Sequence, residues 1–230
     1  MDNRATGLKG TPPGGHPLAL AVLVVFAVAM AYMEAAIVVY LRQLYYPNGF
    51  VFPLVVIEGK LLLIEIGREL STLVFLAAIG WFAGRRFAER FAMFCMAFAL
   101  WDIFYYVWLK VMLGWPDSFI TWDILFLIPL PWIGPVLSPI LVSLALIAGS
   151  VAIMVRLNAG GVFRPIVREW LIAVGGAWLI LLSYMLDTEA TIGGQMPSPY
   201  RWELLIAGIA AGFYALMRTL YRTSGICEDE

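Results

Sequence analysis

The stretch PLALAVLVVFAVAMAYMEAAIVVYL, residues 17–41, decides the class of fold. Glu34 is its single charged residue. A helix needs about 20 mostly apolar residues to cross the hydrocarbon core of a bilayer, so this stretch predicts a membrane-spanning helix. A cleavable signal peptide is the competing interpretation, because residues 27–29 (Ala-Val-Ala) fit a cleavage pattern. The apolar run continues well past residue 29, which favours a retained helix.

The composition of the whole chain agrees with a membrane protein. Of its 230 residues, 62% are hydrophobic and 13% are charged, and the mean hydropathy is +0.87. Soluble domains carry about 25% charged residues, so this chain cannot cover a water-exposed surface with polar side chains. The lipid bilayer is therefore the expected partner. The net charge of −1 argues against nucleic acid, whose binding needs a basic face.

We predict an all-α fold, a polytopic transmembrane bundle of about six helices. Residues 1–16 are expected to form a cytoplasmic tail, 17–222 one transmembrane domain, and 223–230 an acidic C-terminal tail. The predicted helices are about 17–44, 55–83, 88–113, 134–156, 169–187 and 201–221.

The segment between the third and fourth predicted helices is rich in proline, with Pro116, Pro129, Pro131, Pro135 and Pro139 between residues 114 and 139. Its apolar part, residues 120–128, is too short to span a bilayer. It predicts either an interfacial loop with tryptophan anchors or a re-entrant segment that covers the outer mouth of the bundle. In the re-entrant case, we expect Asp123 to join the polar residues described below.

Basic residues predict the orientation of the helices. In a six-helix arrangement, ten of the fifteen Lys and Arg residues fall on one side of the membrane: Arg4, Lys9, Arg85, Arg86, Arg90, Arg156, Arg164, Arg168, Arg218 and Arg222. Because Lys and Arg are in excess in cytoplasmic loops, this bias predicts that both termini are cytoplasmic.

Several ionisable residues lie inside the predicted helices. Each costs roughly 2.5–3.5 kcal/mol near the centre of a membrane helix, and such residues are usually functional. The second helix presents Glu65, Arg68, Glu69 and Thr72 on one stripe, at the i, i+3, i+4 and i+7 spacing of a helix face. Glu34 in the first helix, and Asp102, Tyr105 and Tyr106 in the third, fall at similar depth. The sequence therefore predicts one polar site in the outer half of helices one to three.

The charge of this site leaves its chemistry open. Its four carboxylates, Glu34, Glu65, Glu69 and Asp102, outnumber Arg68 at the same depth, and Arg42, Lys60 and Lys110 lie nearer the outer edge. Protonated carboxylates suit proton transfer. A set of oxygen ligands suits a hard metal ion, for which these four carboxylates are the candidates.

Two further interpretations stay open. A membrane-embedded enzyme acting on a lipid or quinone-like substrate would use Glu65 or Asp102 as base and Tyr105 or Tyr106 as acid. An ion-pair network around Arg68 that only fixes helix packing is the purely structural interpretation. We favour the binding of a cation, protons or a small ligand, in a transport-like function.

Other motifs are limited. The single histidine, His16, lies in the N-terminal tail, and the two cysteines, Cys95 and Cys227, form no C-x-x-C pair. We therefore do not expect histidine-ligated haem, a zinc-thiolate site or an Fe–S cluster. Gly208 and Gly212 form a G-x-x-x-G motif, which predicts close helix packing within the chain or in a homo-oligomer. Membership of a larger membrane complex, as a non-catalytic subunit, is a further possibility.

A set of motifs between residues 34 and 136 resembles a family of uncharacterised bacterial multi-pass inner-membrane proteins. They are EAAIVVYLR (34–42), EIGRELST (65–72), WDIFYY (101–106), GWP (114–116) and WDILFLIPLPWIGPV (122–136). The resemblance implies the bacterial inner membrane. It implies no established activity and assigns no catalytic residue.

Overall fold

The protein is mostly helical in the computed structural model, which describes residues 17–46 and 59–224. Six long helices and one short helix are present in these ranges. They are α1 (Pro17–Tyr45), α2 (Lys60–Ala83), α3 (Phe87–Leu113), α4 (Leu137–Asn158), α5 (Val167–Met185), α6 (Thr188–Ile192) and α7 (Trp202–Ser224). The predicted all-α membrane bundle is confirmed, with a small hairpin added to it.

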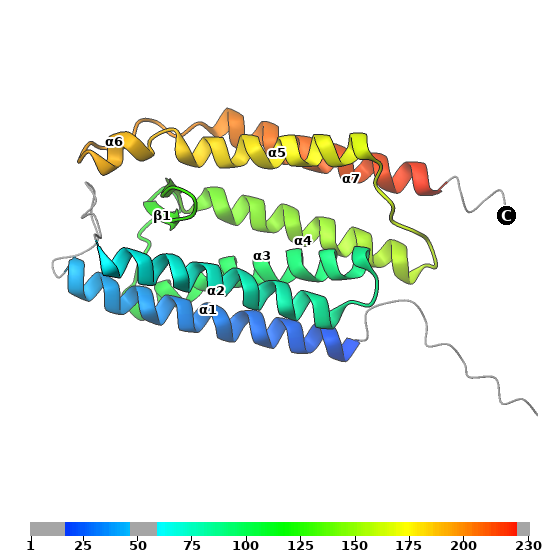
Figure 1. Cartoon of the computed structure of the whole chain (residues 1–230), viewed down its shortest axis with the longest axis horizontal. Helices are drawn as coiled ribbons and strands as arrows, with labels where there is room; N and C mark the ends of the chain where they lie inside the picture. The colour runs from blue at the N-terminus through cyan, green and yellow to red at the C-terminus, as the bar shows by residue number, and fades with distance from the viewer. Residues whose placement is uncertain (1–16, 47–58, 225–230) are drawn as a thin grey trace, which may run out of the picture.

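Five of the described helical segments are long and apolar enough to cross a membrane: Pro17–Tyr45, Phe87–Leu113, Leu137–Asn158, Val167–Ile192 and Trp202–Thr223. The remaining predicted span, the second one at about 55–83, corresponds to α2. This helix runs alongside the others (Figure 1). With 24 residues it extends for roughly 36 Å, long enough to cross a bilayer. Its first half carries the charged residues Lys60, Glu65, Arg68 and Glu69, which set it apart from the five apolar helices.

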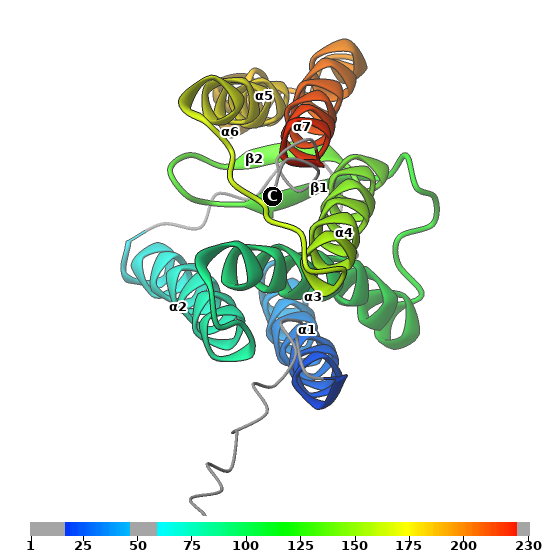
Figure 2. The same ribbon diagram turned by 90° about the vertical axis from the view of Figure 1, so that its right-hand side faces the viewer.

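The long helices lie side by side, and α3 is the central one (Figures 1 and 2). It packs against α1, α2 and α4, while α5 packs mainly against α7. Small residues on α3, among them Ala92, Ala97 and Ala99, are fully buried and allow its neighbours to approach closely. The α5–α7 pair joins the rest through α4 and through the hairpin. The first and last described residues lie at the same end of the bundle (Figure 1).

A two-stranded antiparallel hairpin lies at the opposite end, between the α5–α7 pair and helices α1 to α3 (Figure 2). Its strands are β1 (Trp122–Phe126) and β2 (Trp132–Pro135), with Asp123 paired to Gly134 and a register shift between Ile124 and Phe126. The sequence analysis predicted an irregular segment here and missed these strands. β1 and β2 are rich in aromatic and β-branched residues, which favour strands, and the prolines fall in the connection and at the end of β2.

The predicted helix bounds hold within a few residues, with two differences. The fourth helix begins at Leu137 rather than at residue 134, because Gly134 and Pro135 belong to β2. The fifth ends at Met185 and is followed by the separate short helix α6. The predicted tail 1–16, the predicted first turn of the second helix before residue 59, and residues 225–230 lie outside the described residues.

Helices α5 and α7 meet at two glycines. A methyl group on Gly208 would lie 2.5 Å from the carbonyl oxygen of Gly176, and one on Gly176 would lie 2.6 Å from that of Gly208. A methyl group on Gly212 would meet no atom within 4 Å. The G-x-x-x-G motif therefore brings two helices of the same chain together, and Gly208 is the residue in close contact.

We expect Gly208→Ala to destabilise the protein by about 1–3 kcal/mol through overpacking. Gly212→Ala is the matched control, because both substitutions gain the same helix propensity and only one creates a clash. Thermal unfolding in detergent measures the difference. Equal unfolding temperatures for the two variants would contradict the close α5–α7 contact.

Candidate functional site

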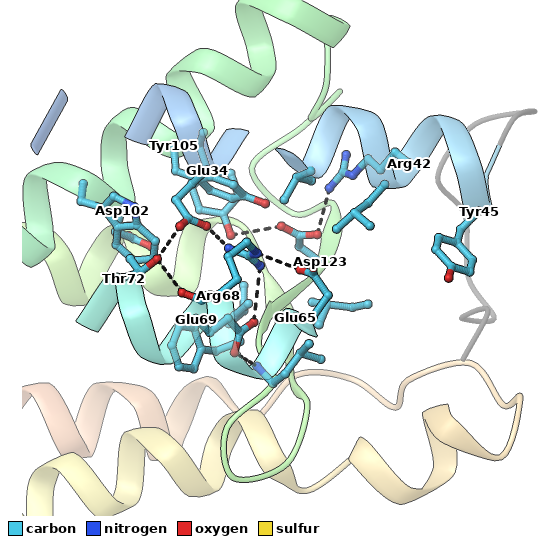
Figure 3. Close-up of a pocket in the computed structure, with 18 of the residues that line it drawn as sticks. Glu34, Arg42, Tyr45, Glu65, Arg68, Glu69, Thr72, Asp102, Tyr105 and Asp123 are labelled. Carbon is cyan, nitrogen blue, oxygen red and sulfur yellow. Dashed lines mark hydrogen bonds and ion pairs between the residues drawn. The ribbon is translucent and has the colours of Figure 1, made fainter. Parts of the chain in front are cut away.

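Arg68 lies at the centre of a cluster of carboxylates contributed by α1 and α2 (Figure 3). Its Nη1 donates to Oε2 of Glu34, and its Nε donates to Oε2 of Glu65 over 2.8 Å. Its Nη2 lies 3.9 Å from Oε1 of Glu69. All three glutamates are buried, whereas the Arg68 side chain is 19% exposed. The i, i+3 and i+4 spacing in α2 places Glu65 and Glu69 on either side of the guanidinium.

The hairpin completes the cluster from the other side. The backbone N–H of Leu127, just after β1, donates to Oε2 of Glu69 over 2.8 Å. Asp123 in β1 accepts from Nη2 of Arg42 at 3.1 Å and from the hydroxyl of Tyr106 at 3.3 Å. Burial raises the pKa of Asp123 to about 6, against the opposing effects of Arg42, the Ile124 amide and Tyr106. The hairpin is thus held to α1, α2 and α3 by polar contacts rather than by packing alone.

Asp102 in α3 stands apart from the two arginines. Its Oδ2 accepts a hydrogen bond from the hydroxyl of Ser143 in α4, at 2.8 Å. The four ion pairs of this cluster in the described residues join Arg42 to Asp123 and Arg68 to the three glutamates, so none of them involves Asp102. Thr72 donates its hydroxyl to Oε1 of Glu34, on the neighbouring helix. Asp102 is therefore the carboxylate of this cluster without a recorded cationic partner.

These side chains line one pocket of about 120 Å³. All eight residues predicted as a binding site contribute to its wall: Glu34, Glu65, Arg68, Glu69, Asp102, Tyr105, Tyr106 and Asp123. Arg42, Tyr45 and Tyr46 also line it, which places it toward the C-terminal end of α1. The grouping of these residues is an observation, whereas a ligand for them remains a prediction.

Five carboxylates and two guanidiniums line the described wall of this pocket, an excess of three carboxylates. Lys110 does not reduce the excess, because its Nζ donates to the carbonyl oxygens of Gly114 and Pro116 at the end of α3. In the described residues no group of three or more His, Cys, Asp or Glu is placed to hold a metal ion. The predicted metal site at Glu34, Glu65, Glu69 and Asp102 thus gains no support from the geometry. Arg68 lies where the cation between the three glutamates would lie.

Two residues of the site, Arg42 and Ser143, were not predicted as site residues. Arg42 lies eight residues after Glu34, a spacing that keeps both on one face of α1, so the signal was present. It was instead placed at the outer edge. Ser143 gave no signal, because a lone serine in an apolar helix is common. The contact between Leu127 and Glu69 depends on the hairpin and could not be predicted without it.

No family model, curated protein or solved structure matches this chain. The resemblance to uncharacterised bacterial membrane proteins therefore remains a prediction. The case for a function must come from the pocket itself.

We expect Arg42→Gln to destabilise the protein by about 3–5 kcal/mol, because the substitution leaves the buried Asp123 carboxylate without its ion-pair partner. The double variant Arg42→Gln/Asp123→Asn removes both charges and should regain much of the lost stability. Unfolding in detergent, followed by the loss of helical circular dichroism, measures both. A double variant less stable than Arg42→Gln would show that the pair does not anchor the hairpin.

Proposed function

We propose that the pocket between α1, α2, α3 and the hairpin binds a small cation, the proton included, and that the protein transports it. The observation that carries this proposal is the excess of three carboxylates over guanidiniums in one largely buried pocket of about 120 Å³, in which Asp102 is half-buried. A volume of this size suits a proton, a small inorganic cation or a small amine, rather than a metabolite.

The free-energy cost of burying charge limits how many of these carboxylates can be ionised without a partner. An ionised carboxylate without compensation is too costly in an apolar interior, so it must acquire a proton or a cation. Arg42 and Arg68 each hold at least one carboxylate. Within residues 17–46 and 59–224, Asp102 has a hydroxyl donor and forms no ion pair, and Glu69 has only a distant guanidinium partner. These two carboxylates are therefore the proposed points of exchange.

Access to the pocket is proposed from the outer side of a bacterial inner membrane. The pocket lies at the end of the bundle away from the described termini, near Tyr45 and Tyr46. The loops at residues 84–86 and 159–166, at the opposite end, carry three of the basic residues that predict a cytoplasmic side. The proposal thus has both termini in the cytoplasm. The family resemblance suggests the bacterial membrane.

Flux measurements in liposomes test this function. The purified protein is reconstituted around a pH-sensitive dye, and proton or monovalent cation flux is driven by an imposed gradient. We expect Asp102→Asn and Glu69→Gln each to reduce the flux at least tenfold, because an amide neither carries the charge nor exchanges the proton. Both amides keep an oxygen that can accept the existing hydrogen bonds from Ser143 and from the backbone N–H of Leu127.

Glu203→Gln is the matched control, because Glu203 is exposed in α7 and does not line the pocket. It should leave the flux unchanged. Unchanged flux in Asp102→Asn and Glu69→Gln would exclude the pocket as the transport site. Elemental analysis of the same preparations adds a second arm. A stoichiometric divalent metal that is lost in Asp102→Asn would show that the pocket is a divalent-metal site, and would contradict proton or monovalent-cation transport.

The enzyme and subunit interpretations have no comparable support. Tyr106 donates its hydroxyl to Asp123, and Tyr105 lines the same pocket. These contacts suit a polar network, but the pocket is small for a lipid or quinone ring. We therefore keep cation transport as the single proposed function.

A further inference from the structure

A second cavity, of about 380 Å³, lies between α3 and α4 on one side and α5 and α7 on the other. It shares no lining residue with the polar pocket. Its wall is mostly apolar and includes small residues such as Gly149, Ala173 and Gly212. The cavity exists because the α5–α7 pair contacts the rest of the bundle mainly through α4 and the hairpin.

The cavity opens toward the surface that faces lipid. Val174 and Phe213 line it and are 48% and 57% exposed, while Ala92 and Ile153 line its buried wall. The lining is almost entirely apolar and runs along α4, α5 and α7 from Val142 to Glu169. A single flexible hydrocarbon chain fits the shape better than a protein segment.

The end of the cavity near the start of α5 is polar and basic. Glu169 and Thr219 line it there, and the Glu169 carboxylate accepts from Nε and Nη2 of Arg222 at 3.1 Å. Arg218 Nε lies 3.9 Å from the same carboxylate. Arg164 and Arg168, exposed on the neighbouring backbone, carry further positive charge. Four arginines against one carboxylate leave this end positively charged, close to the loop between α4 and α5.

We propose that this cavity binds one anionic phospholipid, with an acyl chain between α4, α5 and α7 and the phosphate beside Arg164 and Arg168. The apolar wall recognises the chain, and the basic end selects an anionic headgroup over a zwitterionic one. The bound lipid fills the space between the α5–α7 pair and α3–α4. This site is independent of cation binding in the polar pocket.

Native mass spectrometry of the full chain tests the site. The protein is exchanged into detergent with equal amounts of phosphatidylglycerol and phosphatidylcholine, and the lipids that it retains are counted. We expect about one phosphatidylglycerol per chain for the unaltered protein. Arg164→Gln/Arg168→Gln should lower the preference for phosphatidylglycerol by about tenfold, because basic residues near the headgroups provide the selectivity.

A matched pair of glycine substitutions tests whether the acyl chain of the lipid lies in the cavity. A Cβ on Gly212 or on Gly175 meets no atom within 4 Å, but only Gly212 lines the cavity. Gly212→Phe should fill the cavity and abolish retention of the lipid, whereas Gly175→Phe should retain it. Because neither glycine leaves a clash at Cβ, both variants are expected to fold.

Three results would overturn the proposal. Equal retention of the lipid in Gly212→Phe and Gly175→Phe would show that no acyl chain occupies the cavity. Equal binding of phosphatidylcholine and phosphatidylglycerol by the unaltered protein would show that the site does not select an anionic headgroup. A dimer that dissociates in Gly212→Phe, without a change in bound lipid, would make a second copy of the chain the occupant.

Discussion

The ion pairing of the Arg68 guanidinium with Glu34, Glu65 and Glu69 is the interaction on which much of the hairpin end of this bundle depends. In the low-dielectric interior of a membrane protein, a charge is stable only when its partners are held within a few ångströms. Glu34 lies on α1 and the other two on α2, so the pairing fixes the relative height and rotation of these helices. Glu69 extends the constraint by accepting from the Leu127 amide of the hairpin.

The hairpin brings further polar groups to this end of the bundle. Its two strands pair with each other, and the backbone N–H of Leu127, just after β1, is satisfied by Glu69. Asp123 then carries a carboxylate from the hairpin into the pocket, where Arg42 and Tyr106 receive it. The α5–α7 pair rests on the other side of β2. The same element therefore closes the polar pocket and supports the helix pair that borders the apolar cavity.

Much of this arrangement could be predicted from the sequence, because the signals are strong. Apolar length identified the spans, and the spacing of Glu65, Arg68 and Glu69 placed three charges on one face of α2. Similar depth in adjacent helices was enough to bring Glu34 and Asp102 to the same pocket. The strands of the hairpin were missed, because a short and mostly apolar stretch next to prolines cannot be assigned to strand or helix from periodicity alone. The apolar cavity was missed as well, since it arises from the position of α5 and α7 against α4, which no local pattern encodes.

The charge state of the pocket is the central claim, and infrared spectroscopy of the reconstituted protein tests it most directly. The account predicts a protonated carboxylic acid band near neutral pH that decreases when a transported cation is added. It also predicts that this band is weaker in Asp102→Asn, while Glu203→Gln keeps it. A spectrum that is the same in all three proteins and unaffected by cations would contradict the account. The carboxylates would then be a fixed ion-pair network whose role is to hold the helices together.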